Sequence, residues 1–107
     1  MDARSALEAA VRKQVFAKRE SKDPLFASDV ENVSFIQGKG MNITDLSGLE
    51  KCTALAQLEL PENQIKDVAP LKGLERLQFI DLSKNQISDI STLGTVKALQ
   101  YLELTGN

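Results

Sequence analysis

The apolar residues of this chain recur at a constant interval of 22 residues, and that interval limits the possible folds more than any other feature. The segment "LQFIDLSKNQISDI" covers residues 77–90, "LAQLELPENQIKDV" covers 55–68, and "LQYLELTGN" covers 99–107. A unit of this length can form one short strand and a return segment, but it cannot bury its apolar side alone. The sequence therefore predicts coils stacked at the strand spacing of about 4.8 Å around a continuous apolar core.

Two polar columns accompany the apolar ones. One column holds Asn63, Asn85 and Asn107, and the other holds Asp45, Asp67 and Asp89. The Asn amides follow the strands, where they can bond backbone groups of their own and adjacent coils. The Asp carboxylates suit local turns in which a side chain bonds the backbone. Calcium binding by these columns is an alternative that the pattern favours less.

Residues 1–32 have helical spacing instead, and we predict that they form a helical N-terminal cap in at least two pieces. Ser5 and Glu8 have the spacing of a capping box, with Ser5 as the N-cap and Glu8 bonding back to its amide. An apolar stripe follows, made of Leu7, Ala10, Val11, Val15 and Phe16. Pro24 ends this pattern, and Ser28 or Asp29 then caps a short second helix that ends near Asn32.

The charge is divided unevenly between this cap and the repeats. Residues 1–22 carry six basic and three acidic groups (+3), whereas residues 23–107 carry seven basic and twelve acidic groups (−5), and the sum is −2. Arg12, Lys13, Lys18 and Arg19 are interpreted as a solvated basic face, with a membrane or nucleic-acid surface as the less favoured alternative. The acidic repeats would repel phosphate and favour basic partners.

Composition argues against catalysis, cofactors and metals. The sequence has no histidine, a single cysteine and no Gly-rich phosphate loop, so we expect no enzyme activity and no metal or cofactor site. A carboxylate pair formed by Glu59 and Asp81 is the remaining catalytic alternative, but it would lie on an open, wet surface. Cys52 shares a column with Leu74 and Val96, which predicts a small buried apolar residue. The opening residues lack the apolar segment of a signal peptide and no apolar run is long enough to span a membrane, so we expect no leader and no membrane segment; the compartment remains open.

The repeats resemble the 22-residue, internalin-like subclass of bacterial leucine-rich repeat proteins. The resemblance is carried by "NQIKDVAPLKGLERLQFIDLSKNQISDISTLGTVKALQYLELTGN", "ALEAAVRKQV" and "ITDLSGLEKCTAL". It implies an α/β leucine-rich repeat solenoid with a short parallel sheet on the concave face, 3₁₀ or irregular segments on the convex side, and a helical N-terminal cap. It also implies protein ligands, and relatives that are often secreted or attached to the cell surface.

The chain departs from the family pattern at the start of the repeats. Gly38 and Met41 replace the Leu and Asn of the motif, so Val33–Ile43 is a degenerate row that merges with the cap. Phe26 stands where similar caps tend to place a hydroxyl. We therefore predict a cap over residues 1–32 and repeats over 33–107, of which one is degenerate, two are full and one is truncated at the C-terminus.

Strand alternation predicts which residues face the open concave side. The predicted partner-binding residues are Phe35, Gln57, Phe79 and Tyr101 in one column and Glu59, Asp81 and Glu103 in the next. Exposed aromatic residues are frequent anchors of protein interfaces, although these could simply pack on one another. Stacked acidic residues oppose stability, which either a basic protein partner or solvation would relieve. The leading hypothesis is a protein-protein interaction module that binds neither nucleic acid nor membrane.

The C-terminal edge predicts a different behaviour. The strand over residues 99–104 is not followed by a further return segment, so one side of Leu99, Leu102 and Leu104 would be bare. The chain is accordingly expected to be either a capping and stability fragment of a longer repeat protein or a half that self-associates, as a homodimer, through this edge.

Overall fold

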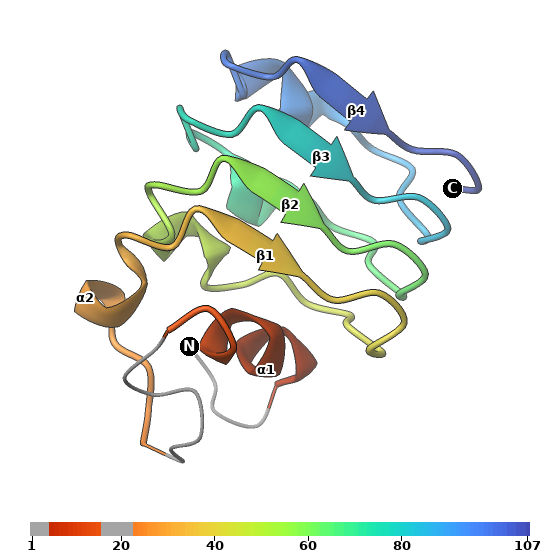
Figure 1. Cartoon of the computed structure of the whole chain (residues 1–107). Coiled ribbons are helices and arrows are strands. Elements are labelled where there is room, and N and C mark those ends of the chain that lie inside the picture. The colour runs from red at the N-terminus through yellow and green to blue at the C-terminus, as the bar shows by residue number, and fades with distance from the viewer. Residues whose placement is uncertain (1–4, 16–22) are drawn as a thin grey trace.

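The computed structural model describes residues 5–15 and 23–107, and over this part it shows a short stack of coils (Figure 1). Two helices come first, α1 (Ala6–Arg12) and α2 (Ala27–Val30). Four strands follow: β1 (Phe35–Gln37), β2 (Gln57–Glu59), β3 (Phe79–Asp81) and β4 (Tyr101–Glu103). Between consecutive strands the chain returns through 3₁₀ helices at Leu49–Lys51, Ala69–Leu71 and Ser91–Thr95.

The strands form one parallel sheet in the order β1-β2-β3-β4, and its register reproduces the 22-residue interval. Phe35 pairs with Gln57, Gln57 with Phe79, and Phe79 with Tyr101. The backbone ladder continues beyond the strands, since Gly38 N donates to Glu59 O at 2.9 Å. The predicted α/β solenoid with a parallel sheet is therefore confirmed.

The inward residues of the coils form one core. Ile36, Leu58 and Ile80 are the middle residues of β1, β2 and β3, and each is 0% exposed. Cys52 is also fully buried in this core, as its column predicts. Burial stops at β4, where Leu102 is 38% exposed, and at Ile90, which is 47% exposed.

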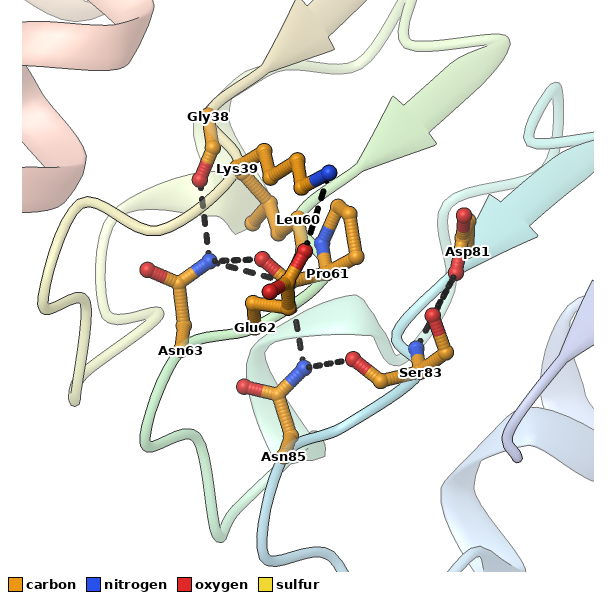
Figure 2. Close-up of polar contacts among 9 residues, drawn as sticks. All are labelled: Gly38, Lys39, Leu60, Pro61, Glu62, Asn63, Asp81, Ser83 and Asn85. Carbon is orange, nitrogen blue, oxygen red and sulfur yellow. Dashed lines mark hydrogen bonds and ion pairs between the residues drawn. The ribbon is translucent and has the colours of Figure 1, made fainter. Parts of the chain in front are cut away.

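The Asn column confirms the predicted ladder between coils (Figure 2). Asn63 Oδ1 accepts from Ile43 N at 3.0 Å, and its Nδ2 donates to Gly38 O at 2.9 Å and to Leu60 O at 3.0 Å. Asn85 repeats this geometry one coil later, with Ile65 N as donor and Leu60 O and Leu82 O as acceptors. Each buried amide thereby satisfies backbone groups that would otherwise lose their hydrogen bonds to water.

The Asp column makes the predicted local turns. Asp45 Oδ1 accepts from Ser47 N at 2.8 Å, Asp67 Oδ1 from Ala69 N at 2.8 Å, and Asp89 Oδ1 from Ser91 N at 2.9 Å. These bonds lower the pKa of the Asp45 and Asp89 carboxyls below their ordinary value, through the hydroxyl and the amide of the serine.

The first row of repeats departs from the motif because α1 packs against β1 from below (Figure 1). Leu7, Ala10 and Val11 of α1 are buried in the same core as the coils. A Cβ on Gly38 would lie only 3.3 Å from the Ala10 Cβ and 3.1 Å from Leu60 Cδ2. Ala10 of the helix, together with Met41 and Leu60, therefore leaves no room at Gly38 for the Leu side chain of the later coils.

The capping details of the helices differ in part from the sequence predictions. Ser5 is the N-cap of α1 and its Oγ accepts from Glu8 N at 3.0 Å, as predicted. The prediction of Ser28 or Asp29 as the N-cap of the second helix was wrong. Phe26 holds that position, and Asp29 lies inside α2 with its carboxylate accepting from Phe26 N at 2.8 Å.

The predicted solvated basic face was wrong for Arg12. Its side chain is largely buried, with Nε 2.7 Å from Glu8 Oε1 and Nη2 2.5 Å from Asp23 O. A guanidinium has enough donors to bind a carboxylate and a carbonyl together, so Arg12 ties α1 to the segment before α2. Lys13 is exposed, whereas Phe16, Lys18 and Arg19 lie outside the described residues. The division of the chain at residue 32 stays a prediction.

Candidate functional site

The outward side of the sheet carries all the residues that the sequence predicts for partner binding. We call this surface the sheet face, and it consists of Phe35, Gln57, Glu59, Phe79, Asp81, Tyr101 and Glu103. The alternation of the strands places these side chains opposite the core residues that separate them along each strand. Most of them are half-buried by their neighbours, and Tyr101 is 48% exposed.

Two of the three aromatic residues on the sheet face pack on each other. The rings of Phe79 and Tyr101 are stacked, with their centroids 4.4 Å apart and an interplanar angle of 6°. Gln57 stands between Phe35 and Phe79 in the register of the sheet. The alternative that these aromatic residues pack on one another therefore applies to the pair on β3 and β4.

Asp81 and Glu103, two of the three acidic residues on the sheet face, bond to the residue two positions further along the chain. Asp81 Oδ1 accepts from Ser83 N at 3.0 Å and from Ser83 Oγ at 2.7 Å (Figure 2). Glu103 Oε1 accepts from Thr105 N at 2.9 Å and also from the Thr105 hydroxyl. The Thr105 bonds lower the pKa of the Glu103 carboxyl, and the neighbouring charge of Asp81 opposes this lowering.

Glu59 is different because the residue two positions further along is Pro61, where Asp81 and Glu103 have Ser83 and Thr105. Proline has no backbone N–H and no hydroxyl, so the turn made by Asp81 and Glu103 cannot form here. In residues 5–15 and 23–107, Glu59 has neither a hydrogen-bond nor an ion-pair partner for its carboxylate. It is therefore the acid of the sheet face that remains available to an external donor.

Glu59 lines an open hollow of about 440 Å³ where the sheet face meets the end of α1. The hollow is also lined by Lys13, Gln14, Gln37, Gly38, Lys39, Met41, Pro61 and Asp81. Of its two lysines, Lys39 is engaged with Glu62, with the Nζ atom 3.0 Å from Oε2 (Figure 2). Reasoning from the sequence missed Lys13 and Gln14, because no local signal places the end of α1 beside strands that follow it by more than 20 residues.

The residues predicted for self-association lie at the outward edge of β4. Leu102 is exposed, while Leu99 and Leu104 are half-buried against the core. In the part of the chain that the structure describes, β4 pairs with β3 on one side only.

Two further kinds of site, a reactive thiol and a metal centre, can be checked among the described residues. Burial raises the pKa of the Cys52 thiol to about 11, so it stays protonated and unreactive at neutral pH. Over residues 5–15 and 23–107, no three His, Cys, Asp or Glu side chains converge in a way that could hold a metal ion. None of the helices in those ranges has the length and apolar character needed to cross a membrane.

Comparison with known proteins agrees with this architecture. Two solved structures from Listeria monocytogenes str. 4b F2365 are similar, both with a TM-score of 0.85. Internalin C2 is 28% identical over 94% of this chain and 44% of its own length. Internalin F is 29% identical over 95% of this chain and 30% of its own length. This chain thus spans less than half of either protein.

The family comparison covers the later coils. No curated protein matched the chain. The model of the leucine rich repeat family matches residues 53–107, which is the part that contains β2, β3 and β4 with the Asn ladder between them. The predicted resemblance is confirmed, and the chain belongs to the leucine-rich repeat family, with an internalin-like fold.

Proposed function

We propose that this chain is a protein-interaction module that binds its partner through the sheet face. One observation carries the proposal: Phe79 of β3 and Tyr101 of β4 stack on each other on the outward side of the sheet. Among the described residues, no helix covers that side of β3 and β4 (Figure 1). Aromatic residues on an open surface are typical anchors of protein interfaces, since they bury much area at little entropic cost. Membership of a repeat family whose coils present a continuous surface supports the same function.

The charge of the sheet face supports a basic partner. Glu59, Asp81 and Glu103 lie in register on adjacent strands. Their like charges repel, and a cationic segment on the partner would relieve that repulsion. Complementary charge of this kind mainly sets specificity and the rate of association, so binding should weaken as salt rises.

The test is capture of a partner from the native host, followed by affinity measurement with Tyr101→Ala and Gln57→Ala. Phe26→Ala is the matched control, because Phe26 is 61% exposed but lies at the start of α2, away from the sheet face. We expect the sheet-face variants to lose most of the affinity at unchanged melting temperature, and the control to keep it. Equal affinity of all the variants would contradict the proposal.

A second candidate function is association through the C-terminal edge of the sheet. The exposed side chain of Leu102 on β4 supports it. The outward edge formed by Leu99, Leu102 and Leu104 would accept the same edge of a second copy, and it would equally accept a further coil of the repeat. Light scattering on the 107-residue chain and on Leu102→Lys tests the first of these. A dimer that Leu102→Lys dissociates would support it, whereas a monomer in both cases would rule out edge association.

A further inference from the structure

The hollow where the sheet face meets the end of α1 combines Glu59, an acid that is unpaired among the described residues, with a mixed polar and apolar lining. Pro61 and Met41 are its apolar side chains, and the other lining side chains are polar or charged. At about 440 Å³ the hollow is at the lower end of the range for small-ligand sites, which is enough for one long side chain and too little for a folded segment.

Among residues 5–15 and 23–107, the competition for the Glu59 carboxylate is weak. Asp81 in the same hollow already accepts from Ser83 N and Ser83 Oγ, so much of its capacity is used. Lys39 also lines the hollow, but its ammonium group forms an ion pair with Glu62. Lys13 lines the hollow and is exposed, without an ion pair to Glu59 among the described contacts. The hollow therefore contains acceptor capacity that a donor from outside can use.

From this arrangement, and resting on the proposed function, we propose that the hollow receives one arginine side chain of the protein partner. A guanidinium donates two parallel N–H bonds to a carboxylate, which the compact ammonium of lysine cannot do. The three methylene groups of arginine would lie along Pro61 and Met41, the apolar side chains of the hollow. Glu59 then determines specificity, and the aromatic pair supplies the main contact area.

The experiment uses the 107-residue chain and three blocked amino acids as probes: the N-acetyl amides of arginine, lysine and citrulline. Citrulline has nearly the shape of arginine without its charge. We expect arginine amide to perturb the NMR resonances of Gln37, Gly38 and Glu59, with lysine amide weaker and citrulline amide without effect. Equal perturbation by citrulline amide would overturn the proposal, as would perturbation spread over all surface acids.

Three variants sharpen the test. Glu59→Gln should weaken binding of arginine amide about threefold to fivefold, as expected for one partly exposed ion pair. Pro61→Ser should also weaken it, because the new serine can occupy Glu59 as Ser83 occupies Asp81. Glu75→Gln is the matched control and should leave binding unchanged, because Glu75 is exposed but belongs neither to the hollow nor to the sheet face. If Glu75→Gln reduces binding as much as Glu59→Gln, the effect is general charge and the proposal fails.

This failure is distinguishable from failure of the proposed function. Arginine amide could fail to bind while Tyr101→Ala still abolishes capture of the partner, in which case only the arginine assignment is wrong. If Tyr101→Ala leaves capture unchanged, the sheet face is not the interface, whatever the probes do.

Discussion

Equivalent positions of the repeat are covered at one end of the sheet and exposed at the other. At the first coil, Ile36 is 0% exposed because α1 packs beneath it, whereas Leu102 in the same column of the last coil is 38% exposed. Gly38 and Met41 replace the motif residues beside α1, while Leu104 and Asn107 keep them at β4. The departures from the motif thus lie beside α1, where a helix stands in place of a preceding coil. Four predictions test this difference between the two ends.

The largest effect should come from removing the N-terminal helical cap. Deletion of residues 1–30 exposes the floor of the first coil, which includes Val33, Ile36 and Ile43. Each large apolar side chain left in water costs about 1.5–3 kcal/mol. We expect an insoluble or unfolded chain, and circular dichroism with thermal melting checks this. A soluble truncation that melts cooperatively would show that α1 is dispensable.

The Asn ladder should contribute more to the free energy of unfolding near α1 than at β4. Asn63 is buried and bonds Met41 N, Ile43 N and Gly38 O, so Asn63→Ala leaves buried backbone groups unpaired. We expect a loss of roughly 2–4 kcal/mol in the free energy of unfolding. Asn107 makes the same kind of bonds at an exposed end, and Asn107→Ala should cost roughly 1 kcal/mol or less, since water replaces the amide. Urea unfolding measures both, and equal losses would contradict the comparison.

Restoring the motif beside α1 should destabilise the chain. Gly38→Leu places a side chain against Ala10 and Leu60, and such overpacking costs about 1–3 kcal/mol. Gly94→Ala is the control, because a Cβ at Gly94 meets no atom within 4 Å. We expect a lower urea midpoint for Gly38→Leu and an unchanged midpoint for the control. A Gly38→Leu variant as stable as the unmodified chain would mean that α1 can move away from β1.

The smallest effect, dependence on acid, should be equal at the two ends. Local serine bonds lower the pKa of Asp45, in the first coil, and of Asp89, in the third, below the ordinary value of 3.8. A lowered folded pKa stabilises the folded state above pH 3.8, and this contribution is lost as pH falls through the folded value. Melting temperatures should therefore fall below pH 3.8, and Asp45→Asn and Asp89→Asn should each reduce that fall equally. A difference between the two variants would show that the stabilisation from these turns depends on their distance from the ends of the sheet.

Much of the fold was predictable from the 22-residue interval. The register Phe35–Gln57–Phe79–Tyr101, the core columns, the Asn ladder and the Asp turns all follow from it, because stacked coils repeat each contact once per row. The outward position of the sheet-face residues followed from strand alternation for the same reason. These features depend on local sequence and on contacts between equivalent coils, so they can be inferred from a single sequence.

Other features required the tertiary structure. The burial of Arg12, the hollow beside Glu59 and the need for Gly38 all depend on where α1 packs, which no interval in the sequence specifies. The left-handed backbone before the Asn column is another case. Gly40, Glu62, Lys84 and Gly106 share it, although only two of them are glycine. The repeat determined each coil and its stacking, whereas contacts between unlike elements were decided only when the chain folded, because their partners lie far apart in sequence.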